Sequence, residues 1–283
     1  MRKQGFREST CRYAVQVLNS VNRHASLLDP ETVKEYLAKA TFSEARKERV
    51  SHDLARFYKW KGIPFEKPRY RKVKKLPFIP LETEVDQLIG GMGKKTACLL
   101  QLLRETGMRC GEASAAKWTD IDYERSTIVV QPEKHGRSRI LRISGRLIAM
   151  LNQLPKGSPC IFHTPEQDPI SSLHHARRNF ERQRKQLAVK LQNPRLLWIH
   201  MHTLRHLYAT KTYHQTKDIL HVMRQLGHTN IVHTLTYTHL VDFPSEEFVC
   251  KVAKTVKEAS ELVEAGFNYV CDVEGYKLFR KRK

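Results

Sequence analysis

Three short segments near the C-terminal end of the chain combine residue types that could act on a phosphodiester. They read His202-Thr203-Leu204-Arg205, Leu226-Gly227-His228 and Thr234-Leu235-Thr236-Tyr237-Thr238-His239. Arg205 precedes His228 by 23 positions, and Tyr237 follows nine positions later. A guanidinium can hold phosphate oxygens, a histidine can exchange a proton, and a tyrosine hydroxyl can attack phosphorus. The segments therefore favour phosphodiester cleavage without a metal.

Two upstream segments complete the pattern. Arg109 stands in Glu105-Thr106-Gly107-Met108-Arg109-Cys110-Gly111-Glu112, and Lys134 in Glu133-Lys134-His135-Gly136-Arg137. The order Arg, Lys, His-x-x-Arg, His, Tyr resembles that of the tyrosine recombinases, the phage-integrase and Xer-type family. The resemblance covers residues 10–237 and extends to integrases of the archaeal type. It implies an enzyme that breaks and rejoins duplex DNA through a 3′-phosphotyrosine, without metal, ATP or another cofactor.

The resemblance also implies a role for each polar residue. Tyr237 would attack the scissile phosphate, which Arg109 and Arg205 would grip by its non-bridging oxygens. Lys134 would protonate the leaving 5′-oxygen. Alone, Tyr237 would more often be a buried helical tyrosine, since the chain has 10 of them, but its fixed distance from His228 favours the nucleophile.

The remaining site residues are predicted to support these groups. His202, one helical turn before Arg205, would accept the proton of Tyr237 or donate a hydrogen bond in the transition state. His228 would be projected by a turn at Gly227, although such a histidine is more often a helix-end cation. Glu112 would orient Arg109, or would be a plain residue of a helix start. A metal site built on His202 and His206 is improbable, because Thr203 stands where a zinc hydrolase needs glutamate; His206 is expected in the core or behind the site.

Composition agrees with a polyanionic partner. The chain carries 50 Lys and Arg against 29 Asp and Glu, a formal charge of +21, and a pI near 9.9. Double-stranded DNA ranks above an anionic membrane surface, because the basic residues are spread along the chain without an amphipathic terminal helix. Six scattered cysteines form no C-x-x-C pair, and the longest apolar runs are too short to cross a bilayer. We expect a reduced, cytoplasmic, nucleoid-associated protein.

The predicted fold is mainly α with a small β-sheet, an α+β protein in four segments. These are a helical DNA-clamping domain at 1–66, a basic linker at 67–77, a catalytic domain at 78–242, and a β-α-β-β extension at 243–283. In the first, Asp29-Pro30 reads as an N-cap followed by proline at the first helical position. In the third, β-branched segments flank Lys134 and predict a hairpin. Predicted DNA contacts are Arg69, Arg71, Lys72, Lys74 and Lys75 in the linker, and Arg137 and Arg139 in the hairpin.

Three functions fit these features to different degrees. A recombinase acting as a tetramer around a Holliday junction leads, with the C-terminal extension docking on a neighbouring copy and accessory DNA-bending proteins as further candidate partners. A type IB topoisomerase does similar chemistry as a monomer. A non-catalytic DNA-binding regulator would fit the charge and the helices but would not explain the six polar positions of the motif.

Overall fold

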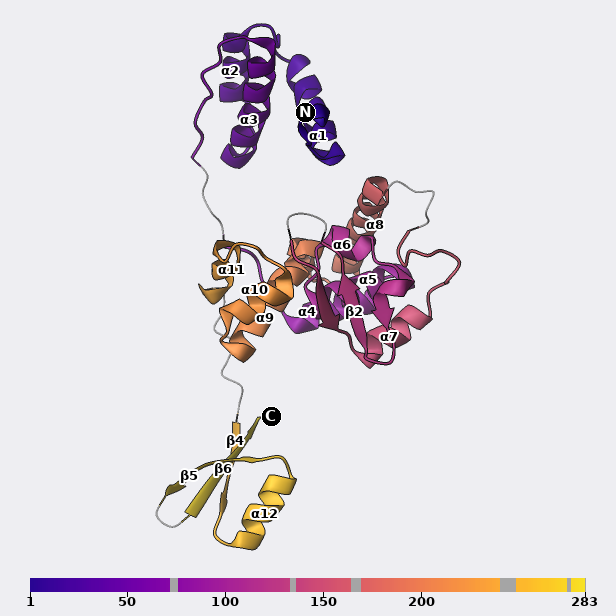
Figure 1. Ribbon diagram of the computed structural model, residues 1–283, viewed down its shortest axis with the longest axis vertical. Helices are drawn as coiled ribbons and strands as arrows, with labels where there is room; N and C mark the ends of the chain where they lie inside the picture. Colours follow the sequence, from indigo (N-terminus) through magenta and orange to yellow (C-terminus); the bar gives the residue numbers. More distant parts are fainter. Residues whose placement is uncertain (72–75, 133–135, 164–168, 240–247, 274–275, 283) are drawn as a thin grey trace. The chain divides into compact units, whose positions relative to one another are not determined.

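The computed structural model describes residues 1–71, 76–132, 136–163, 169–239, 248–273 and 276–282. The chain divides into two compact units, Met1–Leu76 and Pro77–Lys283. Helices dominate both, and the second unit adds two small antiparallel sheets (Figure 1). The predicted mainly helical fold is confirmed. Within the described residues, no helix combines the length and the apolar character that crossing a bilayer requires.

The first unit is a three-helix assembly. A 3₁₀ turn at Arg2–Gln4 precedes α1 (Glu8–Asn22), α2 (Pro30–Lys39) and α3 (Glu44–Lys61). The Asp29 carboxylate accepts a hydrogen bond from the backbone N–H of Glu31 at 3.0 Å, which is the predicted N-cap. A small apolar core joins the three helices; its fully buried side chains include Leu37, Leu54 and Tyr58.

The start of the basic segment lies against α3. Glu48 accepts hydrogen bonds from Lys67 Nζ at 2.6 Å and from the backbone N–H of Tyr70 at 3.2 Å. The Lys67 hydrogen bond is the main cause that lowers the pKa of Glu48 to about 2. Arg69 and Arg71 are exposed. Lys72, Lys74 and Lys75, the other predicted linker contacts, lie outside the described residues.

The core of the second unit forms around α5 (Lys94–Thr106), which packs against α4 (Glu82–Gly91), α7 (Gly145–Asn152) and α9 (Met201–Thr216). The long α8 (Pro169–Lys190) contacts α4, α5 and α6 (Cys110–Ser114). Two 3₁₀ turns, η2 (Trp118–Asp120) and η3 (Pro194–Trp198), link these helices to their neighbours. The last helical elements are α10 (Ile219–Leu226), α11 (Val232–Leu235) and the 3₁₀ turn η4 (Thr236–His239).

A three-stranded antiparallel sheet borders this core. Its order is β1 (Ile121–Asp122), β2 (Thr127–Val130), β3 (Arg139–Arg142). β2 and β3 pair from Thr127↔Arg142 to Val130↔Arg139, which confirms the predicted hairpin. Lys134, between the two strands, lies outside the described residues. The apolar side chains Ile128, Val130 and Leu141 face the core.

The tail forms the predicted β-α-β-β unit. It comprises β4 (Phe248–Ala253), α12 (Val256–Glu264), β5 (Asn268–Val273) and β6 (Tyr276–Arg282), with β6 central in the sheet. Thr255 caps α12 by accepting from the Glu258 N–H at 3.2 Å. Among the described tail residues, Ala253 and Phe279 are fully buried.

Candidate active site

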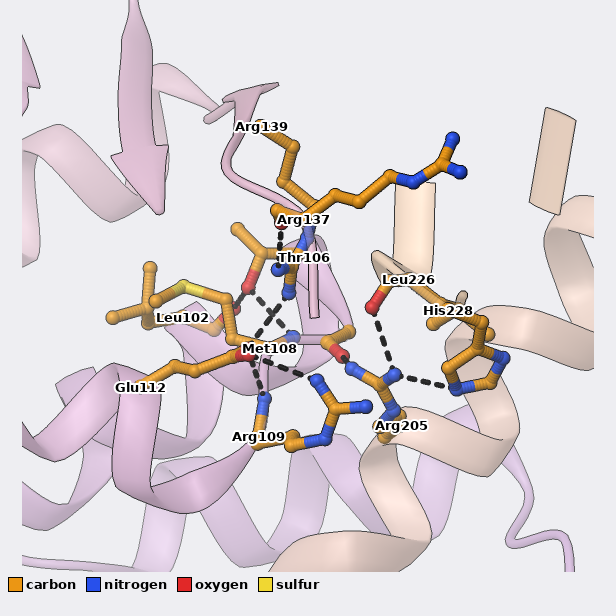
Figure 2. Close-up of polar contacts among 11 residues, drawn as sticks. Leu102, Thr106, Met108, Arg109, Glu112, Arg137, Arg139, Arg205, Leu226 and His228 are labelled. Carbon is orange, nitrogen blue, oxygen red and sulfur yellow. Dashed lines mark hydrogen bonds and ion pairs between the residues drawn. The ribbon is translucent and has the colours of Figure 1, made fainter. Parts of the chain in front are cut away.

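Arg205 is a deeply buried charge of the site. Its side chain on α9 is 2% exposed. Nη1 donates to the carbonyl oxygen of Gly107 at 2.7 Å, while Nη2 donates to the carbonyl of Leu226 at 2.9 Å and to His228 Nε2 at 2.8 Å (Figure 2). Burial, followed by the nearby Arg109 cation, lowers the pKa of Arg205 to about 10. The guanidinium therefore stays charged at neutral pH and is held by three partners from two segments of the chain.

Arg109 shares one buried carboxylate with a second arginine. Glu112 accepts from Arg109 Nη1 at 2.9 Å and from Arg139 Nη2 at 2.7 Å, and its own side chain is fully buried. Glu112 also accepts from the backbone N–H of Arg109 at 2.9 Å, which caps α6. Burial raises the pKa of Glu112, but the hydrogen bonds from Arg139 and Arg109 outweigh it and the net pKa is lowered. The carboxylate stays ionised and hydrogen-bonds Arg109.

Two glycines allow these segments to approach. Gly107 ends α5 with φ +59°, and a Cβ there would lie 2.4 Å from the ring of Tyr208. Gly227 ends α10 with φ +65°, and a Cβ there would lie 2.8 Å from Arg139 Nη1. The backbone N–H of Arg137 donates to the Gly227 carbonyl at 3.4 Å. A larger residue at either position would separate elements that together hold the arginines.

Burial keeps His228 neutral, and its two hydrogen-bond partners select one tautomer. Burial, together with Arg205, lowers its pKa to about 3, so the ring is neutral at physiological pH. Because a guanidinium only donates, Nε2 must accept from Arg205. The proton then sits on Nδ1, which donates to Thr234 Oγ1 at 2.9 Å. Gly227 is the predicted C-cap, and the turn directs His228 onto Arg205.

Tyr237 lies in the same site but is sheltered from solvent. It is 4% exposed and packs with Ala209, Val222 and Leu226. Its hydroxyl is 3.1 Å from Nδ1 of His206 on α9. Burial raises the pKa of Tyr237, although Arg205 and Arg109 are near enough to oppose the increase. His206 therefore contacts the proposed nucleophile directly, closer than sequence reasoning had expected.

The other predicted residues differ in their exposure to solvent. His202 is exposed at the start of α9, with its ring packed against His206 at 4.8 Å between centroids. Arg137 is exposed, and its side chain extends away from the cluster in Figure 2. Arg139 was expected on DNA, but its side chain is only 6% exposed and pairs with Glu112. Within the described part of the chain, no three acidic, histidine or cysteine residues are grouped as a metal site would need.

The sequence analysis did not identify Thr234 as a site residue, and it missed the contact of Arg139 with Glu112. Thr234 is fully buried and fixes the tautomer of His228; its place three residues before Tyr237 was the available signal. Arg139 shares Glu112 with Arg109 across 27 positions. Arg139 is the first residue of the second hairpin strand, and that position alone did not show whether its side chain points inward or outward.

Comparison with known proteins finds relatives that cover most of the chain. The profile of the phage integrase family matches residues 81–242. Tyrosine recombinase XerA of Saccharolobus solfataricus is 28% identical over 195 residues, which cover 66% of this chain and 61% of the relative. Tyrosine recombinase XerC of a Roseiflexus species is 30% identical over 215 residues, 74% of this chain and 66% of the relative. The chain thus spans less than two thirds of either relative.

Solved structures share the fold at low identity. The Tn1549 transposon integrase, in complex with transposon right end DNA, matches with a TM-score of 0.62 at 15% identity, covering 94% of this chain and 96% of that one. A lambda integrase dimer bound to a COC′ core site matches with a TM-score of 0.61 at 16% identity, covering 86% and 76%. Since the family profile spans more than half of the 283 residues, the chain belongs to the phage integrase family, the tyrosine recombinases.

Proposed function

We propose that the chain is a site-specific DNA recombinase, an integrase that breaks and rejoins duplex DNA through a 3′-phosphotyrosine and a Holliday junction. The observation that carries the proposal is the gathering of Arg109, Arg205, His228 and Tyr237 of one chain around a common point. Family membership supports the same reading, since relatives are named tyrosine recombinases.

The arginines would bind the scissile phosphate and neutralise the charge that develops on its oxygens. Arg109 and Arg205 suit this because both are oriented before DNA arrives, and donors fixed in advance stabilise a transition state more than mobile ones. His228, neutral and bonded to Arg205, would orient that guanidinium. His202, exposed on the same helix, would donate a hydrogen bond to the phosphate. Glu112 and Arg139 would act behind Arg109 as positioning residues.

Tyr237 would attack the phosphorus while the leaving 5′-oxygen takes a proton from Lys134, a role that the family resemblance alone assigns. The phosphotyrosine keeps the energy of the broken bond, so rejoining needs no ATP. Neither a metal nor another cofactor enters this mechanism. Arg69, Arg71 and Arg137 are exposed cations that would contact the DNA backbone, along with Lys72, Lys74 and Lys75.

The partners follow from this chemistry. Double-stranded DNA is the substrate, and other copies of the chain would form the tetramer on paired sites. The tail at 243–283 would dock on a neighbouring copy, and DNA-bending proteins could assist assembly. The lambda integrase neighbour is a dimer on its core site, which supports self-association. Strand exchange between two duplexes would distinguish this assembly from a monomeric type IB topoisomerase.

Covalent trapping on a nicked suicide duplex tests the proposal directly. The duplex carries the junction sequences of the genetic element that encodes the chain, and a denaturing gel reports the adduct. We expect a shifted protein–DNA band that disappears in Tyr237→Phe. Tyr213→Phe is the matched control, because Tyr213 packs against the same small cluster as Tyr237. A native chain that binds this DNA in a salt-sensitive manner but forms no adduct would favour a non-catalytic regulator.

A further inference from the structure

The hydroxyl of Tyr237 faces a histidine that the family motif does not single out. His206 Nδ1 is 3.1 Å from the hydroxyl oxygen, and the two ring centroids are 5.7 Å apart. His206 follows Arg205 directly in α9, and its side chain is partly buried. His202, the histidine of the motif, lies one turn earlier and is exposed. The ring placed to exchange a proton with Tyr237 is therefore that of His206.

Both partners of this hydrogen bond are neutral at physiological pH. Burial lowers the pKa of His206 to about 4, and the adjacent His202 and Arg205 act in the same sense. The ring is neutral at physiological pH and offers one basic nitrogen. Burial raises the pKa of Tyr237, so its hydroxyl keeps the proton. With Nε2 of His206 protonated, Tyr237 donates to Nδ1.

We propose that His206 accepts the proton of Tyr237 as the tyrosine attacks, and that His202 is left to contact the phosphate. The inference rests on the proposed recombinase function. The tyrosine O–H bond breaks as the O–P bond forms, and the proton moves to His206 Nδ1. The P–O5′ bond breaks with its electron pair on O5′, which takes a proton from the general acid assigned to Lys134. In rejoining, the imidazolium of His206 returns its proton to the departing tyrosine oxygen.

The balance of charge favours this path once DNA is bound. In the free chain, His206 faces the cation of Arg205 and the ring of His202 on its own helix, with Tyr237 contributed by the 3₁₀ turn η4. A phosphate bound to Arg205 and Arg109 would offset the cations that oppose protonation of the ring. Substrate binding thereby makes His206 a stronger base when the proton has to move.

His206→Gln tests the proposal, because glutamine can accept the tyrosine hydrogen bond but cannot take up a proton. Single-turnover adduct formation is measured on the nicked duplex at saturating DNA, which separates chemistry from binding. We expect the rate to fall roughly 10²-fold, in the range that general base catalysis contributes, with unchanged DNA affinity. Placing difluorotyrosine at position 237 should restore most of the rate, because this more acidic phenol needs less help to ionise.

His202→Gln is the matched control. It should also slow adduct formation, but difluorotyrosine should not rescue it, since its proposed contact is with the phosphate. A His206→Gln variant with the native rate, or one that difluorotyrosine leaves slow, would overturn the assignment. A native chain that forms no adduct would instead reject the recombinase function itself, so the two failures are distinguishable.

Discussion

The arginines and the tyrosine of this site are held in different ways. Arg205 and Arg109 are fixed by hydrogen bonds to Gly107, Leu226, His228 and Glu112, which belong to segments far apart in the chain. Tyr237 stands on a 3₁₀ turn after the four-residue helix α11, and its hydroxyl is held by His206. The arginines proposed to bind phosphate are thus anchored by several hydrogen bonds, whereas the proposed nucleophile stands on a short helical segment.

Removing the shared carboxylate should have the largest effect. Glu112→Gln leaves Arg109 and Arg139 facing each other without a counter-charge in a buried place. Breaking a buried ion pair costs about 3 to 5 kcal/mol, so we expect a loss of this size in the free energy of unfolding, and an adduct rate about 10²-fold lower. Chemical denaturation and the trapping gel measure the two effects.

Glu82→Gln is the matched control for that variant. Glu82 also binds two cations, Arg104 and Lys211, but it is 35% exposed and joins α4 to α5 and α9. Its loss should reduce stability modestly and leave adduct formation unchanged. Equal effects of both substitutions on the adduct rate would contradict a specific role of Glu112 in positioning Arg109.

Acid should weaken the site through its neutral histidines. His228 has its pKa lowered from 6.5 to about 3 by burial and Arg205, and His206 to about 4 by burial and His202. At pH values between these lowered pKa values and 6.5, the two histidines are protonated in the unfolded chain but neutral in the folded chain. Stability is therefore fully present above about pH 6.5 and falls as the pH drops toward the folded pKa values. At pH 5 we expect a loss of about 2 kcal/mol for each ring.

Denaturation midpoints at pH 7 and pH 5 measure this loss. His228→Asn should show a smaller difference between the two pH values than the native chain, because one of the two rings no longer contributes. An undiminished pH dependence in that variant would show that His228 is not kept neutral by the fold.

The smallest expected effect comes from breaking a hydrogen bond between the tyrosine segment and His228, which removes no charge. Thr234 on α11 joins the tyrosine segment to His228 by a hydrogen bond. Thr234→Val keeps the shape but leaves the Nδ1 proton without its acceptor, at a cost of about 1 to 2 kcal/mol. We expect adduct formation to slow about tenfold as Arg205 loses its oriented histidine. Thr216→Val, at the exposed end of α9, should change neither quantity; slow adduct formation in both would contradict the link.

Local signals predicted the elements of the fold well. The Asp29 cap, the Gly107 and Gly227 turns, the hairpin and the tail could all be predicted because neighbouring residues decide them. The two-residue strand β1 was missed, since it exists only by pairing with β2.

The sequence singled out candidate site residues, but it did not show which of them contact one another. Motif spacing singled out Arg109, Arg205, His228 and Tyr237, which the structure brings together. Spacing could not show that Arg139 turns inward to Glu112, or that His206 rather than His202 reaches Tyr237, because those contacts join residues 27 and 31 positions apart. Only the packing of β3, α6, α9 and η4 decides them.

The anchoring of Arg205 also bears on how the chain is made. Its partners Gly107 and Leu226 stand 98 positions before it and 21 after it. During synthesis Arg205 therefore emerges well before Leu226 and His228, and its guanidinium cannot be enclosed until they follow. A prematurely terminated product lacking them would carry an arginine without its Leu226 and His228 partners, and no Tyr237. Under the proposed function, such a fragment would adhere to DNA through its basic residues but would not cut it.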